Sequence, residues 1–154
     1  MCAAGKDAET LYISRGYGDT FDLGLKLGER ASAGEVYALF GDLGAGKTAF
    51  AQGFAKGLGI VDAVTSPTFV ICCAYDGGRL PLYHFDAYRL SDVSEMEEIG
   101  YDEFFYGDGV SLVEWAERIE ELLPEDCIRI RIEREPEEDF DHRCIFIKEP
   151  ERRR

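Results

Sequence analysis

An eight-residue segment at 41–48 constrains the fold of this chain more than any other feature. It reads Gly-Asp-Leu-Gly-Ala-Gly-Lys-Thr, which matches the G-x-x-x-x-G-K-T (Walker A) pattern. A short apolar run at 36–40 precedes the segment, and a helical pattern over 47–58 follows it. A buried strand, a glycine-rich turn and a helix in direct succession predict a loop that binds the phosphates of a nucleotide.

Each part of this motif has a physical role in binding phosphate. The glycines let the backbone curl so that successive N–H groups point at phosphate oxygens. The helix that follows presents the positive end of its dipole to the same phosphates. Lys47 supplies a point charge to the β and γ phosphates. Thr48 supplies a hydroxyl to the Mg²⁺ that bridges them.

A loop of this kind also requires an acidic residue near Mg²⁺, usually at the carboxyl end of an apolar strand. Two residues meet this description: Asp86 follows an apolar run at 82–85, and Glu114 follows one at 110–113. Ligands of open α/β folds bind at this edge of the sheet. The sequence therefore predicts that at least one of the two carboxylates serves the metal.

The predicted elements alternate between strands and helices at the front of the chain, and antiparallel strands come later. Strands are expected at 11–13, 36–40, 69–75, 80–85, 110–113, 127–132 and 144–147, with 69–75 and 80–85 forming a hairpin. Helices are expected at 19–33, 47–58, 91–99 and 117–123, the third beginning at Ser91 or at Ser94. The pattern predicts an α/β layer fold in a single domain over 1–154, with a mixed central sheet, antiparallel additions and flanking helices. The termini, about 1–8 and 149–154, are expected to be flexible.

Charge excludes several partners. The 154 residues include 17 Lys and Arg against 31 Asp and Glu, a net charge of −14. Of these, 14 acidic and 2 basic residues lie in 86–126. Such acidity disfavours independent binding to nucleic acid or to an anionic membrane surface. The acidic stretch is either a solvated surface or a docking surface for a basic partner.

Targeting signals and cysteine usage indicate a cytoplasmic protein. The first residues lack the apolar core of a signal peptide, and no stretch approaches 18 consecutive apolar residues. The five cysteines contain no C-x-x-C pair and therefore predict neither a disulfide framework nor a zinc site.

Two sequence features narrow the class of nucleotide-binding protein. The chain has no N/T-K-x-D element, which disfavours a Ras-like GTPase. A small-molecule kinase needs a cationic lid, but Arg79, Arg89 and Arg118 are the only basic residues between Lys56 and Cys127. A P-loop small-molecule kinase and a non-enzymatic nucleotide-gated adaptor remain as alternatives to an ATPase.

Five short motifs in a fixed order resemble the TsaE (YjeE) family, whose members are the bacterial ATPases of threonylcarbamoyladenosine synthesis in tRNA. The motifs lie at 41–48, 65–69 (TSPTF), 84–90 (HFDAYRL), 98–103 (EIGYDE) and 113–117 (VEWAE). The resemblance covers about residues 20–133. The Walker A pattern alone is generic, whereas the ordered set of five is specific to this family.

The resemblance implies a P-loop NTPase-like fold whose sheet has antiparallel additions. It also implies ATP hydrolysis that is weak until the protein joins the partner proteins TsaB and TsaD, with tRNA reached only indirectly through that complex. ATP and Mg²⁺ are the implied cofactors. Lys47, Asp86 and Glu114 would be catalytic, with Asp86 orienting water or the water shell of the metal. Thr48 and Glu114 would hold Mg²⁺. The residues expected to contact the nucleotide are Asp42, Leu43, Gly44, Ala45, Gly46, Lys47, Thr48, Ala49, Ser66, Thr68 and Trp115.

Overall fold

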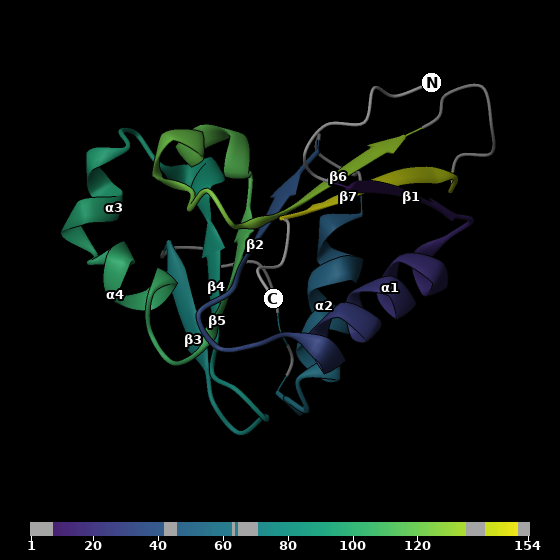
Figure 1. Cartoon of the computed structure of the whole chain (residues 1–154), viewed down its shortest axis with the longest axis horizontal. Coiled ribbons are helices and arrows are strands. Elements are labelled where there is room, and N and C mark those ends of the chain that lie inside the picture. The colour runs from purple at the N-terminus through teal and green to yellow at the C-terminus, as the bar shows by residue number, and fades with distance from the viewer. Residues whose placement is uncertain (1–7, 42–45, 63, 65–70, 135–140, 151–154) are drawn as a thin grey trace.

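A mixed β-sheet with helices on both faces organises the computed structural model, which describes residues 8–41, 46–62, 64, 71–134 and 141–150 (Figure 1). Within these residues the sheet has seven strands in the order β1-β7-β6-β2-β5-β4-β3. The strands are β1 (Ala8–Ser14), β2 (Val36–Phe40), β3 (Cys72–Tyr75), β4 (Leu82–Asp86), β5 (Val110–Glu114), β6 (Ile128–Arg134) and β7 (Arg143–Glu149).

The centre of the sheet is parallel and its edges are antiparallel. Strand β2 pairs in parallel with β5 and β6, and β4 pairs in parallel with β5. The β1–β7, β6–β7 and β3–β4 pairs are antiparallel. The central strands β2 and β5 are short apolar runs buried on both faces, as parallel strands require. This arrangement confirms the predicted fold class, a mixed α/β sheet with antiparallel additions.

Helices α1 (Tyr17–Arg30) and α2 (Lys47–Gly57) cover one face of the sheet and touch each other through glycines. A methyl group on Gly24 would lie 2.3 Å from the carbonyl oxygen of Phe50. One on Gly53 would lie 2.0 Å from the carbonyl oxygen of Phe21. Real side chains do not tolerate such distances, so the two backbones can approach this closely only at glycine. This contact fixes where α2 begins relative to the sheet.

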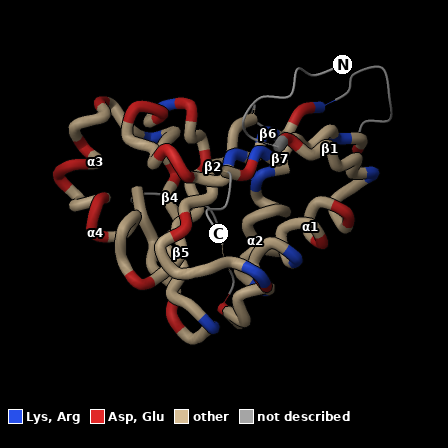
Figure 2. Tube along the Cα trace, viewed as in Figure 1, with Lys and Arg blue, Asp and Glu red and all other residues tan. Residues whose placement is uncertain are grey.

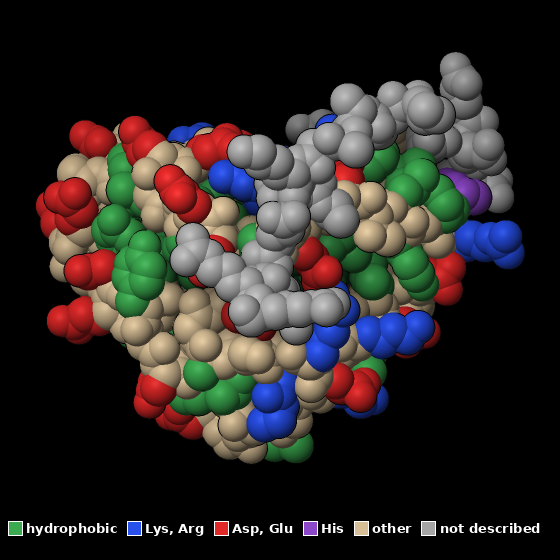
Figure 3. All heavy atoms as spheres, viewed as in Figure 1, with side chains coloured by type: hydrophobic (Ala, Val, Ile, Leu, Met, Phe, Trp, Pro, Cys, Tyr) green, Lys and Arg blue, Asp and Glu red, His purple; other side chains and the backbone are tan. Residues whose placement is uncertain are grey.

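The other face is covered by four short elements: η1 (Ala87–Arg89), α3 (Ser94–Glu98), α4 (Tyr101–Phe105) and η2 (Ala116–Leu122). Buried Phe85, Met96 and Phe105 lie in the hydrophobic core on this face. The outer surfaces of α3 and α4 carry many acidic side chains (Figures 2 and 3). Most of the acidic side chains of 86–126 therefore lie on a solvated surface around a hydrophobic layer.

Most predicted elements are confirmed, and the differences are local. The hairpin is present as β3 and β4. The third helix begins at Ser94, one of the two predicted starts, and the backbone N–H of Ser94 donates to the Asp92 carboxylate, 3.2 Å away. The predicted helix at 117–123 is a 3₁₀ segment, interrupted by non-helical backbone at Ile119. Helix α4 is absent from the sequence prediction, since its five residues are too few for a periodic pattern.

No helix within the described ranges is long and apolar enough to cross a membrane. The predicted flexible ends fall largely on 1–7 and 151–154, outside the described residues, and the ends that are described belong to β1 and β7.

Candidate functional site

The start of helix α2 forms one side of the candidate site. Strand β2 ends at Phe40, and two glycines with positive φ, Gly41 (154°) and Gly46 (107°), stand on either side of the undescribed loop residues. Gly46 is the N-cap of α2 and makes no side-chain capping bond. The first N–H groups of a helix have no partners within the helix and attract anions. The local backbone thus suits a phosphate group.

Lys47 is buried and packed against an aromatic ring. Only 6% of the residue is exposed. Its Nζ donates a hydrogen bond to the carbonyl oxygen of Gly41 and lies 3.4 Å from the centroid of the Trp115 ring. A cation so close to an indole face is attracted to its π electrons. The structure therefore brings together two predicted site residues that are 68 positions apart.

Asp86 and Glu114 form the other side of the site. They are register partners at the ends of the parallel strands β4 and β5, and both are buried. Side chains alternate along a strand, so both carboxylates lie on the sheet face of Leu82 and Leu112, which pack beneath α1 and α2. The structure thus places both predicted carboxylates together on the helix-α2 face.

The surroundings of Asp86 disfavour its charged form. Burial raises the pKa of its carboxyl above the ordinary value, and neighbouring Glu114 raises it further. The backbone N–H of Tyr88 donates to Asp86 Oδ1 over 3.0 Å and lowers the pKa in part. This bond makes Asp86 the N-cap of η1 and fixes the direction of its side chain.

His84 is a site residue that the sequence prediction did not include. Its Nε2 lies 2.7 Å from Glu114 Oε2, and both side chains are almost fully buried. In the sequence, His84 looks like an ordinary strand histidine. Because strand positions two apart share a face, its separation from Asp86 by one residue was the available signal.

Trp115 has a strained backbone. Its φ of 57° and ψ of 43° make it the one described residue other than glycine with positive φ. Its ring packs against that of Tyr88, with the two centroids 4.8 Å apart. The guanidinium group of Arg118 lies over the Tyr88 ring, 5.6 Å from its centroid. Left-handed backbone is costly for a bulky residue and concentrates at functional sites.

The remaining predicted residues separate into described and undescribed positions. Thr48 lies on the first turn of α2 with its side chain exposed, and Ala49 follows it, buried. The predicted residues that lie outside the described part of the chain are Asp42, Leu43, Gly44, Ala45, Ser66 and Thr68.

The described donors fit a magnesium ion. Asp86, Glu114 and Thr48 offer carboxylate and hydroxyl oxygens, which are the ligands that Mg²⁺ prefers. Within the described residues no group of three or more His, Cys, Asp or Glu is placed to hold a metal ion. This set resembles the magnesium sites in which one or two carboxylates act together with water and substrate phosphates.

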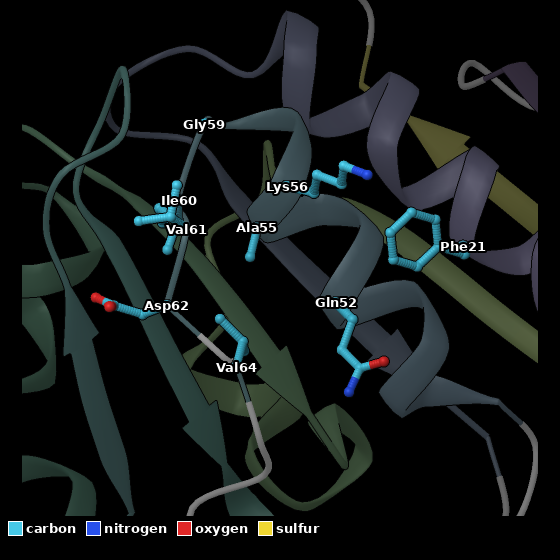
Figure 4. A pocket seen from close by; sticks show the side chains of 9 residues that line it. All are labelled: Phe21, Gln52, Ala55, Lys56, Gly59, Ile60, Val61, Asp62 and Val64. Atoms are coloured by element: carbon cyan, nitrogen blue, oxygen red, sulfur yellow. The ribbon is translucent and has the colours of Figure 1, made fainter.

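A separate groove of about 460 Å³ lies beside α2 (Figure 4). Phe21, Gln52 and Lys56 line it from the two helices, and Val61 and Asp62 line it from the segment after α2. Of the predicted site residues that the structure describes, none lines this groove.

Comparison with known proteins identifies the family. The family model described as "Threonylcarbamoyl adenosine biosynthesis protein TsaE" matches residues 15–145. The chain belongs to the TsaE family. A relative named tRNA threonylcarbamoyladenosine biosynthesis protein TsaE, from Bacillus subtilis, is 57% identical over 104 residues, 68% of this chain and 65% of the relative. This match therefore spans just under two thirds of that relative's length.

Two further comparisons extend over more of each chain. A TsaE protein from Treponema pallidum is 44% identical over 120 residues, 78% of this chain and 88% of the relative. The crystal structure of Bacillus subtilis YdiB superposes with a TM-score of 0.78 and 39% identity, covering 95% of this chain and 88% of that one. The likeness in structure supports the predicted P-loop NTPase-like fold over nearly the whole chain.

Proposed function

We propose that this TsaE-family chain binds ATP with Mg²⁺ and hydrolyses it, as the ATPase subunit of the machinery that forms threonylcarbamoyladenosine in tRNA. The observation that carries the proposal is the register of β4 and β5. This register sets Asp86 beside Glu114, two carboxylates on the face covered by α2, whose start bears the Walker A lysine.

Each site residue has a different proposed role in hydrolysis, which follows from its position. The start of α2 and Lys47 bind the phosphates, and the positive charge of Lys47 opposes the negative charge that develops during transfer. Thr48 and Glu114 would hold Mg²⁺, which when bound supplies charge neutralisation at the phosphate oxygens. Asp86, held by the Tyr88 N–H, orients the attacking water. Ser66 and Thr68, which lie outside the described residues, are proposed to sense the γ phosphate.

Trp115 has a part in nucleotide binding because its ring is stacked on Lys47. A phosphate that binds Lys47 competes with the ring for the ammonium group. Since Trp115 is the only tryptophan of the chain, its fluorescence is expected to change when ATP and Mg²⁺ bind.

The proposed partners are TsaB and TsaD, which would accelerate hydrolysis, with tRNA reached only through them. The support is membership of the family together with the net charge of −14, which opposes direct contact with tRNA.

Release of inorganic phosphate from ATP tests this proposal. Wild-type chain with Mg²⁺ should release phosphate slowly, and faster when TsaB and TsaD are added. Lys47→Ala should lose about a hundredfold to a thousandfold of this activity, the usual cost of removing one group that stabilises transferring charge. Its circular dichroism should match that of the wild type.

Two outcomes would replace the proposal. Transfer of phosphate to an added small-molecule acceptor rather than to water would indicate a kinase. Binding of ATP without turnover at any concentration of TsaB and TsaD would indicate a nucleotide-gated adaptor. Full activity in a well-folded Lys47→Ala chain would overturn the site itself.

A further inference from the structure

The buried imidazole of His84 has one hydrogen-bonded nitrogen and one without a partner. Nε2 contacts Glu114 Oε2 at 2.7 Å, and Nδ1 has no hydrogen-bond partner among the described residues. The residue is 1% exposed. A polar atom left unpaired in a core is unfavourable, whereas a leucine would fill the same space at no such cost. Packing alone therefore does not account for a histidine here.

The register of β4 and β5 allows His84 to reach Glu114. His84 pairs with Leu112 across the parallel strands, and Glu114 lies two residues further along β5 on the same face. The contact is therefore diagonal, from the middle of β4 to the end of β5. A glutamate side chain has three rotatable bonds, and a hydrogen bond to one carboxylate oxygen restricts the plane of the group.

We propose that His84 is a positioning residue, which donates its Nε2–H to Glu114 and so orients that carboxylate for Mg²⁺. This inference rests on the proposed function, because a metal-binding carboxylate is deprotonated and can only accept the hydrogen bond. The donor is therefore the histidine. Partners that orient a metal ligand in this way commonly contribute 10- to 100-fold to metal affinity.

Two substitutions at His84 distinguish positioning from packing. The amide nitrogen of His84→Gln reaches the place of Nε2, while that of His84→Asn reaches only the place of Nδ1. The measurement is the affinity for a non-hydrolysable ATP analogue, with Mg²⁺ and again with a chelator. The ratio of the two affinities isolates the contribution of the metal without any turnover.

The expected result is a loss of about tenfold in the Mg²⁺-dependent gain for His84→Asn, with unchanged affinity in chelator. His84→Gln should keep the gain within about threefold, because it restores the donor that carries the effect. Ser111→Ala is the matched control: Ser111 is also buried with an unpartnered Oγ, but its register partner is Tyr83, so it lies on the opposite face. This control should keep the full gain.

Nuclear magnetic resonance of the wild-type chain tests the same inference without a substitution. The chain has two histidines, so the long-range nitrogen–proton spectrum shows only His84 and His142. We expect a hydrogen on Nε2 of His84. A hydrogen on Nδ1 alone would overturn the inference even if His84→Asn failed to fold.

Each remaining outcome also decides between the two proposals. A folded His84→Asn with the full Mg²⁺-dependent gain, an equal loss in chelator, or a His84→Gln chain as impaired as His84→Asn overturns the positioning role alone. A wild-type chain whose affinity gains nothing from Mg²⁺ overturns the proposed function, and this inference with it.

Discussion

The two faces of the sheet bury different kinds of side chain. Under α1 and α2, the sheet buries His84 in the middle of β4 and Asp86 and Glu114 at its carboxyl edge. Under α3, α4 and η2, the buried side chains of the described chain are hydrophobic apart from Ser111, and the acidic residues of these three elements are partly or fully exposed. The face of the sheet that carries more acidic residues is therefore not the face that carries the candidate site. The position of a carboxylate at a strand end, and its burial, mark the site better than the number of acids nearby.

The first prediction contrasts a buried with an exposed glutamate. Glu114→Gln should lower ATP turnover by about a hundredfold, since a lost metal ligand costs several kcal/mol and each 1.36 kcal/mol is tenfold in rate. Glu121→Gln changes an exposed acid of η2 and should leave the rate unchanged. Steady-state phosphate release by both variants measures these rates. An equal loss of rate in the two variants would contradict the functional difference between the two faces.

The second prediction concerns the contact between α1 and α2. Gly53→Ala should lower the free energy of unfolding by about 1–3 kcal/mol, because the added methyl group overpacks against the backbone of Phe21. Gly18→Ala, in the same helix pair but with nothing within 4 Å, should raise it by about 0.5–1 kcal/mol through helix propensity. Urea titration measures both, and a neutral Gly53→Ala would show that the helices separate easily.

The third prediction uses the raised pKa of Asp86. Folding raises the pKa of Asp86 and so favours its protonated form more than the unfolded chain does, and this contribution to stability is present at acidic pH and is lost as pH rises through the raised pKa. Asp86→Asn should therefore melt a few degrees above wild type at pH 7, with an advantage that shrinks on acidification. Thermal melts across pH measure the difference, while hydrolysis should fall because the oriented carboxylate is gone.

The smallest effect is expected on the acidic outer surface. Changing Glu95, Glu97 and Glu98 of α3 together to glutamine should alter stability by no more than about 0.5 kcal/mol per position and leave basal hydrolysis unchanged. If this surface docks a basic partner, affinity for that partner should fall and lose its salt dependence. Unchanged affinity would identify the surface as a solubility feature.

Sequence patterns were sufficient for elements that are long, apolar or bounded by glycine. Strand β2 lies at the predicted residues, and α2 begins at the predicted Lys47. The short elements on the acidic face were not predictable in the same way. Helix α4 follows Gly100 at a φ of 71°, and η2 contains a kink at Ile119, so tertiary packing rather than periodicity sets both.

The candidate site was predictable as a set of residues but not as a set of contacts. Asp86 and Glu114 were recognisable because each ends an apolar strand. The His84–Glu114 bond joins residues 30 positions apart, and only the register of β4 and β5 reveals it. The stacking of Lys47 on Trp115 likewise depends on the left-handed backbone at Trp115, which no local sequence pattern predicts.

That stacking would make the proposed nucleotide binding an exchange rather than a simple addition. The ammonium group of Lys47 would give up its contact with the indole for a phosphate, so the attraction to the ring would be subtracted from the affinity for the nucleotide. A cation–π contact contributes about 0.5–2 kcal/mol, depending on its exposure to solvent, which corresponds to a factor of roughly 2 to 30 in a dissociation constant. Any event that moves residue 115 away from Lys47 would therefore tighten the proposed ATP binding without touching the nucleotide.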